Sequence, residues 1–285
     1  MKSTQTILDQ ILVDVRKELA EAQSKRPLAE LRRMLADAPP VRSFRKALAV
    51  QFGLIAEIKE RSPSHGPMRR ENVQEGPSAY EKSGIVRAVS VLTNSSHFGM
   101  SIERLREIKM GGTKAVLRKD FIFDEYQVYE ARAFGADAIL LMANLLEKQE
   151  MTQLHALAKE LGMDVLFECH NREQIEQLPA GAEIYGINSR TFEAKKNVLG
   201  VGTYGVSALL GRLGSSKDLT VDLERFELGQ YVPPHAIKVA ESGISPDKIA
   251  MIRDELGFHA ALVGTSVLTS KRGVAKELAS FEEAL

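Results

Sequence analysis

The sequence has one cysteine, no metal-like grouping of histidines and no excess of charge of either sign. Cys169 is the only cysteine among 285 residues, which excludes an internal disulfide framework and a thiolate metal cage and fits a reducing cytoplasm. The six histidines lack the spacing of metal ligands. Lys and Arg together count 38, as do Asp and Glu, so no overall field attracts nucleic acid or an anionic membrane. We therefore expect a cytoplasmic protein without metal, nucleic-acid or membrane partners.

A long apolar run is also missing from the N-terminal segment. The stretch "MKSTQTILDQILVDVRKELAEAQSKRP" is interrupted by charge, unlike a signal peptide. Its apolar residues Ile7, Ile11, Val15 and Leu19 recur every four residues, which predicts an amphipathic helix ending before Pro27.

Short apolar runs alternate with helix-period segments from Gly53 onward. The runs are "LIAEIK" (54–59), "AVSVL" (88–92), "AVL" (115–117), "AILLM" (138–142), "DVLF" (164–167), "IYGI" (184–187), "IKVA" (237–240) and "ALLV" (260–263). Continuously apolar strands are typical of parallel sheets covered by helices. Eight evenly spaced units predict an α/β fold, a (β/α)8 TIM barrel over residues 53–270 in a single domain of residues 1–285. A doubly wound open sheet is the alternative.

An insert interrupts this rhythm after the sixth run. Residues 191–217 contain five glycines where a barrel needs only a loop. Gly200, Gly202 and Gly205 have the G-x-G-x-x-G spacing of a dinucleotide site, but that site belongs in the first strand-to-helix turn of its fold. We therefore predict no dinucleotide cofactor. Three roles stay open for the insert: a lid, a subunit contact or a tolerated extension.

Polar side chains occur at the ends of several runs, where barrel enzymes build their sites. They are Glu57 and Lys59, Lys119 and Asp120, Glu168, and Asn188 and Arg190. Cys169 should point away from Glu168 and into the core. Two simpler interpretations stay open: an ion pair at the barrel rim for Glu57 and Lys59, and a solvated turn for Lys119 and Asp120.

The last two runs end in turns that contain glycine. They supply Glu241, Ser242 and Gly243 after the seventh run, and Gly264, Thr265 and Ser266 after the eighth. Backbone N–H groups at two neighbouring helix starts favour binding of a phosphorylated small molecule. Two lysines in one partly apolar pocket, Lys59 and Lys119, should have pKa values lowered toward neutrality, which suits acid–base catalysis.

Five phrases carry a family resemblance. They are "IAEIKERSPSHG", "SVLTNSSHFGMS", "VLRKDFIFDEYQVYEARAFGADAILL", "GINSR" and "VAESGI". In this order they resemble indole-3-glycerol phosphate synthase of tryptophan biosynthesis, from about Leu54 to Leu268, and residues 1–50 resemble that family's extra N-terminal helices. The resemblance implies a carboxy-lyase without metal or cofactor. Such an enzyme closes the indole ring of 1-(2-carboxyphenylamino)-1-deoxyribulose 5-phosphate and releases carbon dioxide and water.

The resemblance also implies roles for individual residues. Lys119 would be the general acid and Glu168 the carboxylate of the dehydration half. Lys59 would hold the substrate carboxylate, and which lysine acts at which proton transfer stays open. Glu57 would position the two lysines, and Asn188 and Ser62 would contact the substrate. Phe98 and Phe121 would pack on the aromatic ring, and Arg190 would lie near the mouth. The residues implied at the phosphate are Glu241, Ser242, Gly243, Gly264 and Thr265.

The sequence departs from the family pattern in "HFGMS", in Ala115 where proline is frequent, and in the insert 191–217. The alternatives are a related enzyme such as phosphoribosylanthranilate isomerase, and an inactive barrel used for binding or assembly. The residues leave open a monomer or a weak homo-oligomer with a contact through the insert. A substituted anthranilate derivative as substrate is also left open.

Overall fold

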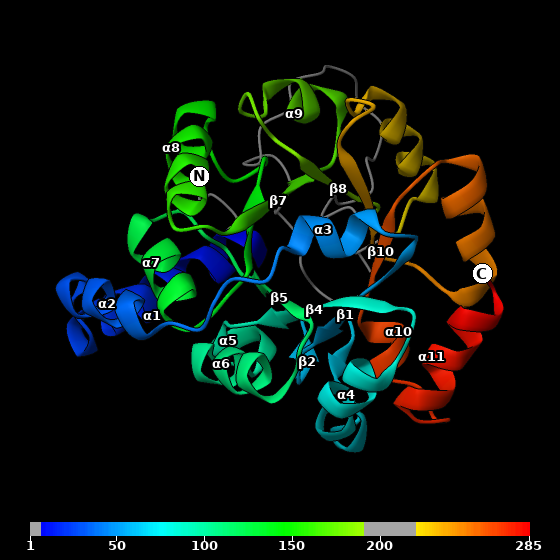
Figure 1. Ribbon diagram of the computed structural model, residues 1–285, viewed down its shortest axis with the longest axis horizontal. Coiled ribbons are helices and arrows are strands. Elements are labelled where there is room, and N and C mark those ends of the chain that lie inside the picture. The colour runs from blue at the N-terminus through cyan, green and yellow to red at the C-terminus, as the bar shows by residue number, and fades with distance from the viewer. Residues whose placement is uncertain (1–6, 191–220) are drawn as a thin grey trace, which may run out of the picture.

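Eight parallel strands form a closed barrel in the computed structural model, which describes residues 7–190 and 221–285. The strands are β1 (Gly53–Ile58), β4 (Val86–Leu92), β5 (Ala115–Lys119), β6 (Ala138–Met142), β7 (Asp164–Cys169), β8 (Ile184–Asn188), β9 (Ile237–Glu241) and β10 (Ala260–Val263). β1 pairs with both β4 and β10, so the sheet closes on itself (Figure 1). The predicted barrel is confirmed, and the open-sheet alternative is wrong.

The strands are apolar on both faces because each face packs on a separate core. Side chains such as Ile55, Leu117 and Leu166 fill the barrel interior. Their neighbours, including Val116 and Phe167, pack between the sheet and the outer helices. Cys169 belongs to this outer core and is fully buried, which confirms its predicted direction.

Helices surround the barrel and separate its strands in the chain (Figure 1). They are α4 (Arg70–Lys82), α5 (Ser95–Phe98), α6 (Ile102–Gly111), α7 (Glu125–Ala133), α8 (Lys148–Glu160), α9 (Arg172–Gln177), the 3₁₀ helices η4 (Leu223–Tyr231) and η5 (Pro246–Lys248), the π-helical turn η6 (Met251–Glu255), α10 (Thr265–Leu268) and α11 (Val274–Glu283). Local capping sets several starts: the Asp124 side chain and Gln127 form a capping box at α7.

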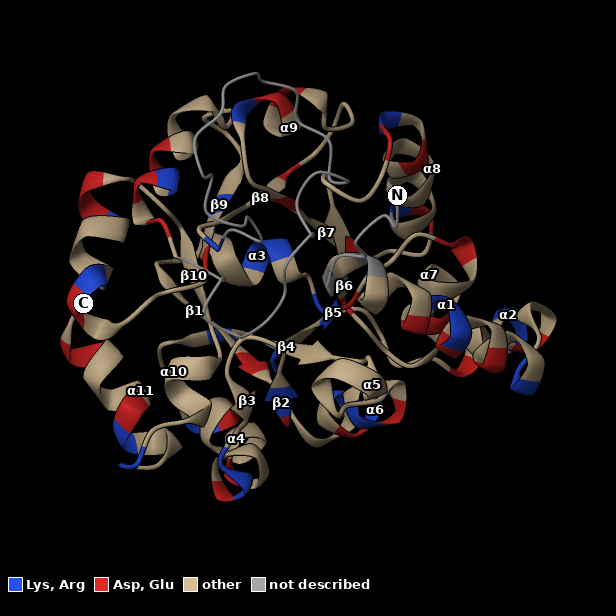
Figure 2. Ribbon diagram, turned by 180° about the vertical axis from the view of Figure 1, so that it is seen from behind, with Lys and Arg blue, Asp and Glu red and all other residues tan. Residues whose placement is uncertain are grey.

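Three helices precede the barrel, as predicted. They are α1 (Ile7–Lys25), α2 (Leu28–Met34) and α3 (Phe44–Ala49), and a 3₁₀ turn, η1 (Leu35–Asp37), follows α2. α3 lies over the N-terminal end of the barrel (Figure 1), where Phe44 and Leu48 join the interior core. Ile11 and Val15 of α1 join the same core. Figure 2 views the molecule from the opposite side, with both signs of charge spread over the outer helices.

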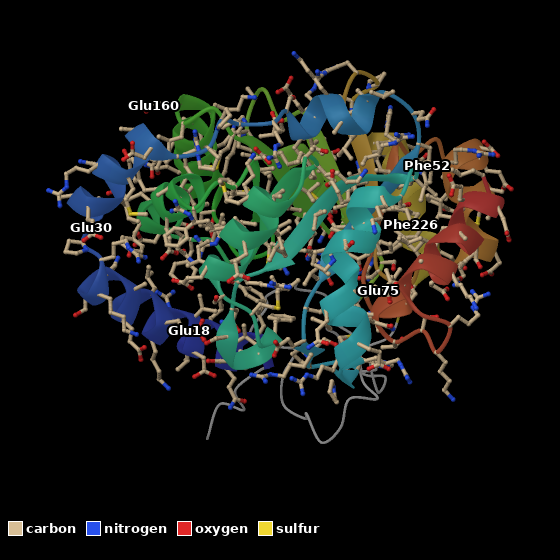
Figure 3. The ribbon with its side chains drawn as sticks, turned by 60° about the horizontal axis from the view of Figure 1, so that its bottom comes forward. Glu18, Glu30, Phe52, Glu75, Glu160 and Phe226 are labelled. Carbon is tan, nitrogen blue, oxygen red and sulfur yellow. The ribbon has the colours of Figure 1, made fainter. Side chains whose placement is uncertain are left out.

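α1 is bonded to the loop that follows β4. The Glu18 carboxylate accepts hydrogen bonds from the backbone N–H of Ser96 at 2.9 Å and from the Asn94 amide at 3.0 Å. His97 Nε2 lies 3.1 Å from the Asp14 carboxylate. Figure 3 labels Glu18 where α1 meets this loop. The N-terminal helices are therefore attached to both ends of the barrel.

A short hairpin, which the sequence interpretation missed, follows β1. It consists of β2 (Arg61–Ser62) and β3 (Gly66–Pro67). Within the described residues, no helix has the length and apolar character needed to cross a membrane. The insert 191–217, with Gly200, Gly202 and Gly205, lies outside the described residues.

Candidate active site

Lys119 lies at the centre of a group of charged side chains at the C-terminal end of the barrel. It is the last residue of β5 and points into the interior, as Leu117 does two residues earlier. Its Nζ lies 3.4 Å from Oε2 of Glu168 on β7 and 3.7 Å from Oε2 of Glu241 on β9. Both glutamates are 1% exposed. Three strands that are distant in sequence thus bring one ammonium and two carboxylates together.

Glu57 and Lys59 form a second charged pair beside this group. Lys59 Nζ donates to Glu57 Oε1 at 2.6 Å, and both residues are buried. They are therefore not an ion pair on an exposed rim. Tyr80 of α4 donates its hydroxyl proton to the backbone carbonyl of Glu57 at 3.1 Å. A Cβ at Gly264 would lie 2.9 Å from Glu57 Cβ, so glycine there makes room for this acid.

The carboxylates raise the pKa of Lys119 instead of letting it fall. Burial alone would lower this pKa, but Glu168, Glu241 and Glu57 together outweigh burial and raise it above the ordinary value. The expected drop toward neutrality is therefore wrong for Lys119. That prediction rests on a neighbouring lysine and a partly apolar pocket, whereas the folded chain surrounds the ammonium of Lys119 with acids from three other strands.

The two glutamates beside Lys119 differ in their protonation. Burial would raise the pKa of Glu168, but Lys119, His170 and a hydrogen bond from Asn188 keep it below the ordinary value. Burial and repulsion by Glu168 raise the pKa of Glu241 to about 8. At pH 7 Glu168 is thus ionised while Glu241 retains its proton. Different pKa values on neighbouring acids suit separate acid and base roles.

Gly186 on β8 provides the space for Glu241. A Cβ at Gly186 would collide with the Glu241 carboxylate. Glu241 is thereby held inside the barrel, within reach of Lys119. The structure places its side chain in the charged group, while its backbone leads into the turn of Ser242 and Gly243.

Asn188, Arg190 and His170 lie around the same strand ends. Asn188 is the last residue of β8 and is 6% exposed, and its Oδ1 accepts the backbone N–H of Arg190 at 2.9 Å. Burial lowers the pKa of Arg190, and Glu57 opposes that effect. His170, after β7, has Nε2 3.5 Å from Glu168 Oε1. Burial lowers the pKa of His170, so the imidazole is neutral at pH 7.

Two phenylalanines, one in α5 and one directly after Lys119 and Asp120, stack on each other. The rings of Phe98 and Phe121 are stacked with centroids 6.5 Å apart. Ser62 is buried at the end of β2, and its Oγ lies 3.4 Å from Oγ of Ser64. The departure "HFGMS" is accommodated because Gly99 takes a left-handed conformation at the end of α5.

The turns after β9 and β10 contain the residues that are predicted to bind phosphate. Ser242 is the non-glycine residue with positive φ, 72°, among the described residues, and Gly243 follows with φ 67°. Gly264 precedes α10, in which Thr265 is the first residue. Ser189 donates its hydroxyl proton to the Ser242 carbonyl at 2.9 Å. Within residues 7–190 and 221–285, His, Cys, Asp and Glu form no group that could hold a metal ion.

The sequence interpretation missed Arg118 and Thr93, and it left open a solvated turn for Asp120. Asp120 is 6% exposed and Arg118 is 4% exposed, so the solvated turn is wrong. The available signal was the alternation along β5: since Lys119 points inward, Arg118 must point outward into the layer of helices. A charged residue in that layer requires a buried partner.

The family model and the curated relatives agree on one family, whereas the solved structures show the fold alone. The family model of indole-3-glycerol phosphate synthase matches residues 8–199. The indole-3-glycerol phosphate synthase of Dehalococcoides mccartyi strain CBDB1 is 36% identical over 93% of this chain and 95% of its own length. That of Nocardioides sp. strain JS614 is 37% identical over 92% and 93%. A solved thiamine phosphate pyrophosphorylase from Pyrococcus furiosus shares the fold, with a TM-score of 0.54, 13% identity, and coverage of 85% of this chain and 97% of that chain.

Proposed function

The chain belongs to the indole-3-glycerol phosphate synthase family, and we propose that its barrel carries out this family's reaction, with Lys119 as the first general acid. Enzymes of this name are carboxy-lyases, EC 4.1.1.48, of tryptophan biosynthesis. The proposed substrate is 1-(2-carboxyphenylamino)-1-deoxyribulose 5-phosphate. The observation that carries the proposal is the ammonium of Lys119 beside the side-chain carboxyl groups of Glu168 on β7 and Glu241 on β9, at the C-terminal end of the barrel.

Lys119 would act on the substrate carbonyl during ring closure. The aromatic carbon that bears the carboxylate attacks the carbonyl carbon, a carbon–carbon bond forms, and the carbonyl oxygen receives a proton from Lys119. The raised pKa of Lys119 keeps the ammonium charged at pH 7. It releases its proton only as negative charge develops on the oxygen, so it stabilises the transition state more than the bound substrate.

The carboxylates would serve the cationic stage and the dehydration. After ring closure the ring carries positive charge, which Glu57 and ionised Glu168 stabilise. Loss of carbon dioxide returns an electron pair to the ring. The hydroxyl then takes a second proton from a lysine ammonium, either Lys59 or reprotonated Lys119, and leaves as water, while Glu168 accepts the proton from the neighbouring carbon that completes the double bond of the indole. Glu168 suits this step because its pKa is held low.

The remaining groups would bind the two anionic ends and the ring. Lys59 would bind the substrate carboxylate from its position beside Glu57, and Asn188 would hydrogen-bond near the substrate amine. Phe98 and Phe121 would contact the aromatic ring. Ser62 of the β2–β3 hairpin would contact the substrate, and Arg190 would support the mouth. Backbone N–H and hydroxyl groups of Ser242, Gly243, Gly264 and Thr265 would bind the phosphate. Such positioning of reactants supplies a large share of the acceleration.

A direct assay tests this proposal. The purified protein is given the carboxyphenylamino-deoxyribulose phosphate, and indole-3-glycerol phosphate and carbon dioxide are measured over time. We expect both products in equal amounts, and no product would refute the function. The isomerase alternative is tested in parallel with phosphoribosylanthranilate, which we expect to remain unchanged. That alternative needs a catalytic thiol, whereas Cys169 is fully buried in the core outside the barrel interior.

A further inference from the structure

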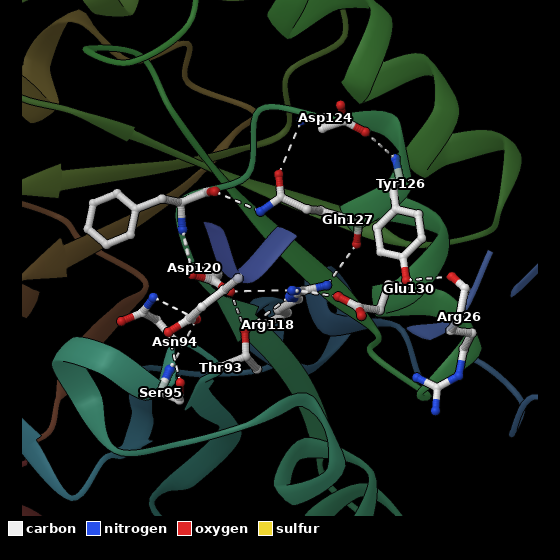
Figure 4. Close-up of polar contacts among 12 residues, drawn as sticks. Arg26, Thr93, Asn94, Ser95, Arg118, Asp120, Asp124, Tyr126, Gln127 and Glu130 are labelled. Carbon is white, nitrogen blue, oxygen red and sulfur yellow. Dashed lines mark hydrogen bonds and ion pairs between the residues drawn. The ribbon is translucent and has the colours of Figure 1, made fainter. Parts of the chain in front are cut away.

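Arg118 lies directly behind Lys119, on the outer side of β5. Its guanidinium is buried between the strand and α7 (Figure 4). Nε donates to Thr93 Oγ1 at 3.0 Å, and Nη1 donates to the backbone carbonyl of Gln127 at 2.8 Å. The guanidinium thus joins the ends of β4 and β5 to the first turn of α7.

Two buried carboxylates share this one cation. Arg118 Nη2 lies 2.9 Å from Glu130 Oε2 and 3.3 Å from Asp120 Oδ2. Thr93 donates its hydroxyl proton to the same oxygen of Asp120 at 2.5 Å. Buried ion pairs seldom add net stability over an apolar core, because desolvation offsets their attraction. A role in fixing geometry is therefore the hypothesis to examine.

The same side chains hold the loop that follows Lys119. Oδ1 of Asp120 accepts the backbone N–H of Phe121 at 2.9 Å. Gln127 Nε2 donates to the Phe121 carbonyl at 2.9 Å, and Gln127 Oε1 accepts the N–H groups of Phe123 and Asp124 at 2.9 and 3.1 Å. The side chains of Asp120 and Gln127 therefore hold the backbone of segment 120–124 through hydrogen bonds within the protein.

From this geometry we propose that Arg118, Thr93, Asp120 and Gln127 are positioning residues for the reaction. They fix the backbone on both sides of Lys119, so that its ammonium faces the carbonyl and the Phe121 ring faces the aromatic part of the substrate. A misplacement of about 1 Å can slow an enzyme by about 10²-fold. The proposal rests on the proposed function, since it assigns Lys119 and Phe121 their tasks.

The opposite end of the same strand provides a matched control. Asp137 accepts the backbone N–H of Val116 at 2.7 Å and Lys109 Nζ at 2.5 Å, and both charged side chains are fully buried. This pair also ties β5 to its surroundings, but at the N-terminal end of the barrel. If both groups only stabilised the fold, substitutions at either end of β5 would affect kcat equally. If the group around Arg118 positions Lys119, only substitutions at the C-terminal end should lower kcat.

The test compares Thr93→Val and Gln127→Met with Asp137→Asn. Each variant is assayed below its own melting temperature, with kcat, KM and inhibition by inorganic phosphate measured separately. We expect kcat to fall about 10- to 100-fold in the first two variants, with inhibition by phosphate unchanged because the turns after β9 and β10 are untouched. Asp137→Asn should lower the melting temperature and keep kcat within about twofold of the wild-type value. Arg118→Lys, which retains the charge but not the planar fork, should keep the fold and lose kcat.

Amide hydrogen exchange supplies a readout independent of activity. We expect at least about tenfold faster exchange at Phe121, Phe123 and Asp124 in Thr93→Val and Gln127→Met, and faster exchange at Val116 in Asp137→Asn. Unchanged kcat in folded loop variants, or an equal loss of kcat in Asp137→Asn, overturns the proposal, as does unchanged exchange in 120–124. A wild type that forms no product refutes the proposed function, and the exchange results then decide the positioning role.

Discussion

Replacing Glu241 by glutamine should remove a pH dependence from the stability of the protein. Glu241 is 1% exposed, its carboxylate lies 3.7 Å from Lys119 Nζ, and burial together with Glu168 raises its pKa to about 8. Glutamine has nearly the same shape and stays neutral at every pH. The variant therefore resembles the protonated acid without its ability to ionise.

The sign follows from the protons bound in each state. Between the ordinary pKa of 4.5 and about 8, the folded chain holds a proton on Glu241 that the unfolded chain has released. The free energy of unfolding must therefore fall as the pH rises through this window, and the contribution is constant below 4.5. At about 1.4 kcal/mol per pH unit the limit is about 5 kcal/mol. Because Glu168 shares the titration, we expect about 2–5 kcal/mol.

Urea unfolding at intervals between pH 4.5 and 9 measures this effect. The stability of Glu241→Gln relative to wild type should increase across the window, by the amount given above. Glu57→Gln is the matched control: the pKa of Glu57 is lowered by Lys59 and Lys119 despite its burial. Its own contribution is lost only as the pH falls below about 4.5. Because the charge of Glu57 also helps to raise the pKa of Glu241, its difference from wild type should change between pH 5 and 8, but by much less than that of Glu241→Gln. A flat difference for Glu241→Gln would refute a protonated Glu241.

Lys119→Met should lower kcat by about 10²–10⁴-fold, with the dissociation constant of the product changed far less; near-normal turnover would refute its role as general acid. Gly186→Ala should displace the acid on β9 and lower both melting temperature and kcat, whereas Gly111→Ala, where a Cβ meets no atom within 4 Å, should be neutral in a thermal melt. Ser242→Gly should relieve the positive φ of 72° and raise stability by about 1 kcal/mol, while Ser242→Gly and Thr265→Ala should raise KM more than they lower kcat. A larger effect on kcat than on KM would count against these two residues as phosphate ligands.

The architecture was accessible from the sequence because each strand is buried on both faces. Continuous apolar runs such as 138–142 and 260–263 coincide with β6 and β10. The predicted run 115–117 is too short, because β5 continues through two charged residues to Lys119. Hydropathy alone cannot show that Arg118 and Lys119 remain in a strand, because their partners lie on β4, α7 and β7. The hairpin of β2 and β3 has too few residues to produce a periodic pattern.

The residue types of the site were also accessible, but their electrostatics were not. A barrel brings the ends of all strands to one face, so Lys119 and Glu168 could be placed together from their positions in the chain. The pKa of Lys119 depends on how many acids approach it. Glu57, Glu168 and Glu241 come from positions separated by many residues, and no local pattern reports their distances. The prediction of a lowered pKa failed for that reason.

Two glycines of the barrel also restrict the order in which amino-acid substitutions can accumulate around the site. Gly186 yields its side-chain space to Glu241, and Gly264 yields its space to Glu57. A larger residue at either glycine displaces the facing acid unless that acid is shortened, and a shortened acid leaves a gap beside the reacting groups. Substitutions at each acid and at its facing glycine are therefore coupled. Any route that alters this chemistry one substitution at a time passes through an intermediate with impaired function, so library designs should vary both positions of a pair together.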